Sequence, residues 1–159
     1  MQKLLRSALV AIIGLLLAVP ASASHYFLAD IADRFSPLAL AEFTRFGLND
    51  TEDVLRNVDT HEDRESFASV TGIDPNELYE IARMCEMLQI EGVGPRAFDL
   101  LYASGVQNIE DLASRSPASL LAELEVVNAS EHLTGVNPPL ELVEAWVERA
   151  SSAPIRVQY

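Results

Sequence analysis

The 159-residue chain is poor in cysteine and in positive charge. A single cysteine excludes a framework of intramolecular disulfides. Eleven Lys and Arg stand against 24 Asp and Glu, and the formal net charge of -13 disfavours nucleic acid and other anionic partners. Seven glycines and eight prolines are too few for a collagenous or low-complexity chain. Because 49% of the residues are hydrophobic, the composition indicates a folded protein with a packed core.

The first 23 residues have the pattern of a secretory signal peptide. Lys3 and Arg6 precede an apolar run over 8–19, and Ala-Ser-Ala at 21–23 fits the A-x-A cleavage pattern. Twelve helical residues span about 18 Å, less than the roughly 30 Å hydrocarbon core, which disfavours an uncleaved membrane anchor. We therefore expect cleavage after Ala23, export to the periplasm or the exterior, and no stable membrane insertion afterwards.

Cleavage at this point leaves 136 residues in which arginine is the only cation. Nine arginines then face 24 acidic residues, so the net charge is -15. The absence of lysine excludes lysine Schiff-base chemistry in the mature chain. Because export normally leads to an oxidising compartment, we expect the only thiol, that of Cys85, to be buried or paired between chains.

The chain repeats itself at an offset of 58 residues. Several residues of the first copy match residues of the second: Pro37 with Pro95, Ala39 with Ala97, Gly47 with Gly105, Leu48 with Val106, Glu52 with Glu110, Asp53 with Asp111 and Val54 with Leu112. After an insertion of about five residues, Thr-Gly-Ile-Asp-Pro at 71–75 corresponds to Thr-Gly-Val-Asn-Pro at 134–138. We therefore predict two copies, over 24–85 and 86–151, followed by a tail over 152–159.

Prolines and glycines mark the ends of short helices within each copy. Five prolines follow a residue suited to the N-cap position: Pro37, Pro75, Pro95, Pro117 and Pro138. Four glycines precede an apolar residue, as a glycine just past a helix end does: Gly47, Gly72, Gly105 and Gly135. No segment alternates regularly between apolar and polar residues. The predicted fold is all-α, with eight or nine short helices and the two copies packed as one compact domain.

Two segments have the apolar spacing of a buried helix face. One runs over 78–88 and includes Cys85, and the other runs over 142–150 and includes Trp146, the only tryptophan. We expect both faces to be buried. Burial raises the pKa of a thiol, so this position disfavours Cys85 as a nucleophile.

The sharpest local motif lies between two predicted helices, over 88–97. Two glycines let the backbone turn tightly and expose N–H groups at the start of the second helix, an arrangement that can hold a phosphate. The candidate binding residues are Gly92, Val93, Gly94, Pro95 and Arg96. Arg96 is the only cation near this turn, and Arg34-Phe35-Ser36 replaces the glycine turn in the first copy.

This motif resembles the helix-hairpin-helix motif. Over about 125 residues the chain resembles a bacterial domain-of-unknown-function family built of tandem helix-hairpin-helix units, in which the step at 71–73 and a C-terminal helix with a tryptophan recur. Motifs of this kind often bind the sugar-phosphate backbone of DNA without reading its sequence. Such binding needs several cations, whereas Glu91 and Asp99 flank this hairpin. The resemblance therefore implies the fold more strongly than it implies DNA binding.

Catalytic and metal-binding patterns are weak. His61 and Glu65 have the i, i+4 spacing of helical ligands, but two ligands do not make a site, and acidic residues commonly begin a helix. No serine lies in a Gly-x-Ser-x-Gly elbow. We expect no cofactor, no metal and no catalytic residue. The sequence predicts a non-catalytic exported binding or scaffold module with a protein partner. The alternatives are sequence-independent DNA binding through 92–96 and an enzyme whose residues meet only in space.

Overall fold

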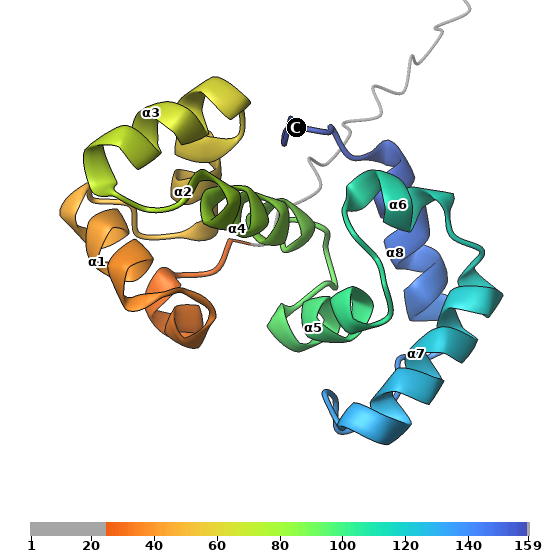
Figure 1. Cartoon of the computed structure of the whole chain (residues 1–159). Helices are drawn as coiled ribbons and strands as arrows, with labels where there is room; N and C mark the ends of the chain where they lie inside the picture. Colours follow the sequence, from red (N-terminus) through yellow and green to blue (C-terminus); the bar gives the residue numbers. More distant parts are fainter. Residues whose placement is uncertain (1–24, 159) are drawn as a thin grey trace, which may run out of the picture.

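The computed structural model describes residues 25–158, and these are almost entirely helical (Figure 1). A 3-10 helix, η1, spans Leu28–Arg34. Eight α-helices follow: α1 Pro37–Arg45, α2 Thr51–Val58, α3 His61–Thr71, α4 Pro75–Met87, α5 Pro95–Ala103, α6 Ile109–Ser114, α7 Pro117–Glu131 and α8 Leu140–Ser152. The all-α prediction is confirmed, and the predicted signal peptide lies outside the described residues.

Prolines begin four of the helices as predicted. The helices α1, α4, α5 and α7 start at Pro37, Pro75, Pro95 and Pro117. The prediction for Pro138 is wrong, because α8 begins at Leu140 with Pro139 as its N-cap. A residue that precedes a proline is pushed out of the helical region, which moves the start past Pro138. The expected cap, Asn137, instead accepts a hydrogen bond at 2.8 Å from the side chain of Asn128.

The turn between α1 and α2 matches the turn between α5 and α6. Gly47 and Gly105 have φ of 74° and 86°, the left-handed conformation that favours glycine. In both turns the next N–H donates to a carbonyl five residues earlier, at 2.9 and 3.0 Å. The N–H after that donates to the carboxylate of Asp53 in one turn and of Asp111 in the other, at 3.0 and 2.9 Å. The residues matched at an offset of 58 therefore play the same local roles.

The predicted role of Gly135 is wrong. The helix α7 ends at Glu131, and His132 is the left-handed residue that follows it, with φ of 56° and its N–H donating to the Asn128 carbonyl at 3.0 Å. The side chain of Asn128 also accepts the N–H of Thr134 at 2.8 Å. These bonds turn the chain three residues before the glycine, so Gly135 lies in the loop beyond the helix end.

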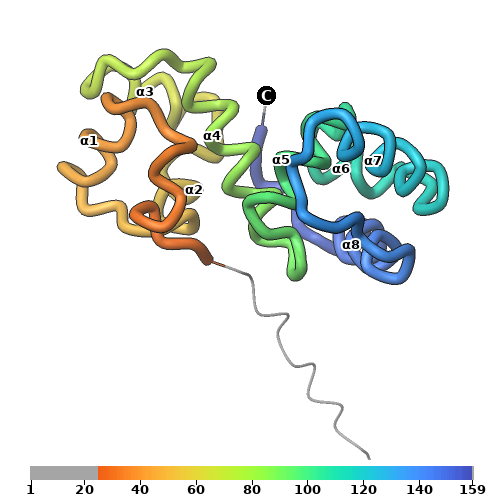
Figure 2. Tube along the Cα trace, turned by 90° about the horizontal axis from the view of Figure 1, so that it is seen from below, coloured from red at the N-terminus to blue at the C-terminus, as the bar shows by residue number. Residues whose placement is uncertain are grey.

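Two hydrophobic clusters share the helix α4. This helix lies between α1–α3 and α5–α8 in Figure 2. The first lies among η1 and α1–α4 and contains Cys85, which is fully buried. The second lies among α5–α8 and contains Trp146, which is 2% exposed. Met87, at the end of α4, belongs to the second cluster. Burial of both predicted faces is confirmed. Within 25–158 no helix is both long and apolar enough to span a membrane.

The chain after α8 returns to the first cluster. We name residues 153–158 the strap, and Figure 1 shows it leaving α8 and ending near α3. It contacts α4, where the N–H groups of Arg156 and Val157 donate to Glu86. The N–H of Gln158 reaches the carbonyl of Asp59, just past α2, at 2.9 Å. The strap therefore ties the second half of the chain to the first.

Candidate functional site

The predicted hairpin joins α4 to α5 through a glycine turn. Gly92 has φ of 89°, and Val93 is fully buried, with its N–H donating to the Ile90 carbonyl at 2.9 Å. Gly94 is the N-cap of α5, and its carbonyl accepts the N–H of Phe98 at 2.8 Å. The structure therefore brings residues 92–96 together in a tight turn followed by a helix start.

Gly92 lies directly against α8. A Cβ at this position would be 3.1 Å from Nε1 of Trp146 and 3.4 Å from Nη1 of Arg149. The first distance is closer than side chains normally approach, and the positive φ is itself unfavourable for other residues. Nε1 of Trp146 is buried without a hydrogen-bond acceptor among the described residues. The absence of a side chain at Gly92 lets the tryptophan ring lie against the turn.

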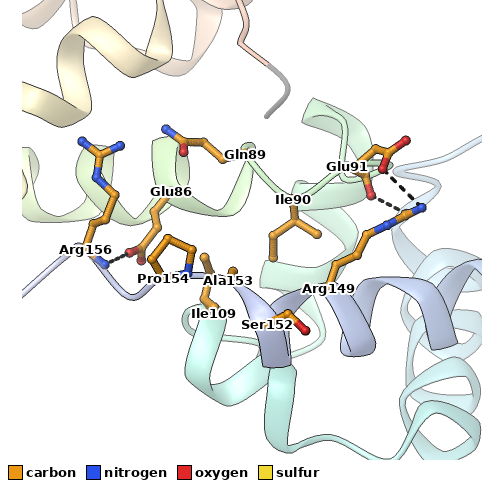
Figure 3. A pocket seen from close by; sticks show the side chains of 10 residues that line it. All are labelled: Glu86, Gln89, Ile90, Glu91, Ile109, Arg149, Ser152, Ala153, Pro154 and Arg156. Atoms are coloured by element: carbon orange, nitrogen blue, oxygen red, sulfur yellow. Dashed lines mark hydrogen bonds and ion pairs between the residues drawn. The ribbon is translucent and has the colours of Figure 1, made fainter. Parts of the chain in front are cut away.

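Arginine from α8 also holds the hairpin. Arg149 donates from Nη1 to the carbonyl of Glu91 at 2.7 Å, and its Nη2 lies 3.4 Å from the Glu91 carboxylate (Figure 3). On another side, a Cβ at Gly94 would be 3.4 Å from Oη of Tyr26. Both glycines of the turn are therefore in contact with other parts of the same chain.

A charged groove lies beside the start of α5. It has a volume of about 580 Å³, and its charged lining residues come from η1 and α5: Asp30, Asp33, Arg34, Arg96 and Asp99. Arg34 pairs with Asp99 through both guanidinium Nη atoms, and its Nη2 donates to Oδ2 at 2.8 Å. Arg96 is exposed, and its Nη1 lies 3.4 Å from the Leu133 carbonyl. We name this feature the hairpin groove. Three carboxylates against two guanidiniums make it unfavourable for a phosphate.

Little unpaired positive charge is present elsewhere in residues 25–158. Seven of the nine arginines there form an ion pair with Asp or Glu: Arg34, Arg45, Arg56, Arg83, Arg115, Arg149 and Arg156. Arg64 is buried and donates to the carbonyls of Val58 and Asp59 at 3.0 and 2.9 Å. A DNA-binding face needs several cations free to replace counterions, and these pairings reduce that supply.

A second cavity, of about 350 Å³, lies between α4, α6, α8 and the strap (Figure 3). Its apolar walls are Ile90, Ile109, Ala153 and Pro154, and six polar residues complete the lining: Glu86, Gln89, Glu91, Arg149, Ser152 and Arg156. We name it the strap pocket. None of these ten residues is a histidine or a cysteine.

Glu86 is the buried carboxyl group of this region. It is 3% exposed, and burial raises its pKa above the ordinary value. The N–H groups of Arg156 and Val157 donate to Oε1 at 2.6 and 2.9 Å, which counters part of that rise. A perturbed carboxyl beside a cavity is a site candidate, but these bonds already give Glu86 a role in holding the strap.

Glu86 and the strap were not predicted from the sequence. One signal was present, because Glu86 interrupts an otherwise apolar run, Met84-Cys85-Glu86-Met87-Leu88. A carboxylate on a buried helix face requires hydrogen-bond donors from another element. The pattern identifies the need for a partner, while only the tertiary structure identifies the strap as that partner.

The remaining predicted positions lie apart from both cavities. His61 and Glu65 are on α3 and line a shallow space of about 280 Å³ with Arg64 and Tyr79. Within 25–158 no group of three or more His, Cys, Asp or Glu side chains is placed to hold a metal ion. Cys85 is reduced and fully buried, and burial raises its pKa.

We expect Cys85 to react with an aromatic disulfide reagent only when the protein unfolds. Its thiol is shielded by the first cluster, and its raised pKa keeps the thiolate scarce at neutral pH. The labelling rate in the native protein should be at least about 100-fold below the rate in denaturant. The absorbance of the aromatic thiolate that the reagent releases, followed for the native and the denatured protein, measures this ratio. Rapid full labelling of the native protein would contradict the burial of Cys85.

The helices, the hairpin and the two clusters define an all-helical class of protein. Residues 35–153 match a family model described as Domain of unknown function (DUF4332), and the chain belongs to that family. Searches of curated proteins and of solved structures gave no significant match.

Proposed function

We propose that this chain is an exported, non-catalytic interaction module that binds a protein partner through the hairpin groove. The mixed charge of the hairpin groove is the observation that carries the proposal. The close packing of Gly92 against Trp146 disfavours the alternative of a phosphate clamp. It gives the glycine turn a structural purpose, the seating of α8, that requires no phosphate. The pairing of Arg149 with the Glu91 carbonyl and carboxylate supports the same interpretation.

The charges of the hairpin groove suit a protein partner. Its lining combines Asp30, Asp33 and Asp99 with Arg34 and the exposed Arg96. Mixed charge of this kind gives register and specificity at the polar rim of a protein interface. A uniform anion such as DNA finds mostly repulsion there. Of the residues 92–96, Arg96 is exposed and contributes its guanidinium to this surface.

We also propose that the chain arose from two copies of a unit of four helices, related to helix-hairpin-helix units. The matched turns at Gly47 and Gly105 support this origin, as do the equal lengths of α1 and α5. The replacement of the glycine turn by Arg34-Phe35-Ser36 in the first copy agrees with divergence after duplication. Only the second copy then keeps a turn that can seat a following helix closely.

Site-specific photo-crosslinking tests the proposed contact. A photoreactive phenylalanine analogue at position 96, in the full chain expressed with its N-terminal segment, should form a discrete crosslinked product with a protein. The same analogue at Val126, which is 71% exposed on α7, serves as the matched control. Equal products from both positions, or none from position 96, would count against the hairpin groove as a contact surface.

N-terminal sequencing should show that the exported chain starts at Ser24.

A DNA titration tests the alternative. We expect fluorescence anisotropy with a labelled duplex to show no saturable binding below roughly 10 µM protein at 150 mM salt, because most arginines are paired. Binding that weakens steeply with salt, and that disappears in Gly94→Glu, would replace the protein-partner proposal by backbone binding of DNA. A circular dichroism spectrum of the variant controls for unfolding.

A further inference from the structure

The strap is held by its backbone at three consecutive residues. The N–H groups of Arg156 and Val157 donate to Oε1 of Glu86 at 2.6 and 2.9 Å, and Figure 3 shows the first of these bonds. The N–H of Gln158 donates to the Asp59 carbonyl at 2.9 Å, and Arg64 donates to the Gln158 carbonyl. Contacts of this kind engage backbone atoms, which every peptide segment offers.

Two strap side chains add selectivity. Nη1 of Arg156 lies 2.8 Å from a carboxylate oxygen of Glu52, and Nη2 lies 3.6 Å from one of Asp59. Val157 packs against the first cluster. The seat therefore accepts a guanidinium between two carboxylates and then an aliphatic side chain on an apolar surface. This combination of charge and apolar contact defines a short recognition pattern, an arginine followed by an aliphatic residue.

Among the described residues, the hydrogen bonds and ion pairs of residues 156–158 go to α2–α4 and to the residue that follows α2, whereas Ala153 packs against the second cluster. Glu52 is on α2, Asp59 follows it, Arg64 is on α3 and Glu86 is on α4. The strap itself arrives from α8, and Pro154 follows the helix end. The polar contacts of residues 156–158 are thus made without α5–α8, so these three residues can leave the seat by rotation about the residues after Ser152 while α8 stays in place.

We propose that this seat is a recognition site for a peptide segment with an arginine followed by an aliphatic residue, and that the strap is its resident occupant. A segment of the same chemistry from a partner protein displaces the strap and makes the same bonds to Glu86, Asp59 and Arg64. This site is distinct from the hairpin groove, although it shares with the proposed function the premise of a protein partner.

The strap pocket strengthens the proposal. It lies beside the strap, and its wall of Ile90, Ile109, Ala153 and Pro154 offers an apolar recess of about 350 Å³. Two of the four apolar wall residues, Ala153 and Pro154, belong to the strap itself. The strap occupies its seat at an effective concentration in the millimolar range, because it is tethered. A partner overcomes this competition by placing a further apolar side chain against Ile90 and Ile109, the two apolar wall residues that lie outside the strap.

A peptide titration with a weakened strap tests the site. The full chain carrying Arg156→Ala loses both ion pairs of the strap, and the probe is a fluorescent, capped Ala-Pro-Ile-Arg-Val-Gln peptide. We expect this variant to bind the peptide at least about tenfold more tightly than the unmodified chain, by anisotropy. A peptide with Glu in place of Arg should bind at least about tenfold more weakly, and adding Glu52→Gln should remove most of this preference.

Arg149→Ala is the matched control, because it removes an arginine from the lining of the strap pocket without touching the strap's seat. It should bind the peptide no better than the unmodified chain. Three results would overturn the proposal. The first is an equal gain of peptide affinity in Arg156→Ala and Arg149→Ala, and the second is equal binding of the Arg and Glu peptides. The third is no saturable binding by a folded Arg156→Ala chain at about 1 mM peptide.

Hydrogen exchange on the unmodified chain gives a second measurement that needs no substitution. At about 5 mM unlabelled peptide the amides of Val157 and Gln158 should exchange several-fold faster, because the displaced strap loses its acceptors. Unchanged exchange at these two amides would overturn the proposal. This readout is independent of crosslinking from position 96, so the peptide site and the hairpin groove can fail separately.

Discussion

Replacing Gly92 by alanine should lower the free energy of unfolding by about 2–4 kcal/mol. The left-handed conformation at φ of 89° costs a non-glycine residue roughly 1–2 kcal/mol. Although Gly92 is exposed, the added Cβ also lies 3.1 Å from Nε1 of the buried Trp146, so the ring must give by a few tenths of an ångström, and overpacking against a buried ring costs about 1–3 kcal/mol. Urea unfolding followed by the fluorescence of Trp146, the only tryptophan, measures the change.

Two other glycines of the chain separate these contributions. Gly105→Ala has a similar φ of 86° but no atom within 4 Å of the new Cβ, so it should cost only the roughly 1–2 kcal/mol of backbone strain. Gly94→Ala has φ of -85° and an ordinary contact with Tyr26, so its cost should stay below about 1 kcal/mol. A loss in Gly94→Ala as large as that in Gly92→Ala would contradict the structural role assigned to Gly92 alone.

The difference expected between Gly92 and Gly94 matters for function as well as for stability. A phosphate clamp uses the N–H groups of the turn, and substitution of either glycine would impair it. A seat for α8 depends on the space at Gly92 and tolerates a small side chain at Gly94. The unfolding free energies of the three glycine variants therefore test the structural interpretation of the hairpin. The DNA titration tests its interpretation as a phosphate clamp.

Helix content and the buried faces followed from local sequence patterns. A proline after a capping residue begins α1, α4, α5 and α7, because the missing N–H is unpaired in the first turn in any case. The apolar spacing around Cys85 and Trp146 predicts burial because it places the apolar side chains on one face of a helix. These signals depend on neighbours within a few residues, which the sequence contains directly.

The errors arose where distant or competing contacts decide the local structure. Asn137 resembles an N-cap in sequence, but it bonds to Asn128, and the proline pair delays the start of α8 to Leu140. His132 takes the left-handed position expected of Gly135 because Asn128 already ends α7 through backbone and side-chain bonds. Local pattern alone does not distinguish the residue that caps from one that resembles a cap.

The strap and its seat lie beyond local prediction. The chain over 152–159 has the composition of a tail, and its place on α4 is set by Glu86, about 70 residues earlier in the sequence. Arg64 lies among polar residues of α3 in sequence, yet it is buried because the carbonyls of Val58 and Asp59 and the strap surround it. The same limitation applies to the contact of Gly92 with Trp146.

Substitutions at Glu86 should separate the role of its charge from its role as an acceptor. Glu86→Ala leaves the two strap N–H groups without their acceptor and should lower the free energy of unfolding by about 2–4 kcal/mol. Glu86→Gln keeps an oxygen that can accept both bonds and removes a buried charge. It should therefore be as stable as the unmodified chain at neutral pH, or more stable.

The pH dependence gives the sign of the charge effect. Burial raises the pKa of Glu86 in the folded state, so the folded chain holds the proton more tightly than the unfolded chain does. Its contribution to stability is therefore fully present below the ordinary pKa and is lost as the pH rises through the raised one. Glu52 and Asp111 have lowered pKa values and act in the opposite direction, but they are common to all three chains.

The difference between Glu86→Gln and the unmodified chain isolates this group. We expect the glutamine variant to gain stability relative to the unmodified chain as the pH is raised from about 4 to 7, in urea titrations at fixed salt. A glutamine variant as unstable as the alanine variant at every pH would show that the negative charge, and not the acceptor, holds the strap. In that case the negative charge of Glu86 would itself attract cationic segments. The seat would then select for positive charge at Glu86 as well as at the carboxylates that pair with Arg156.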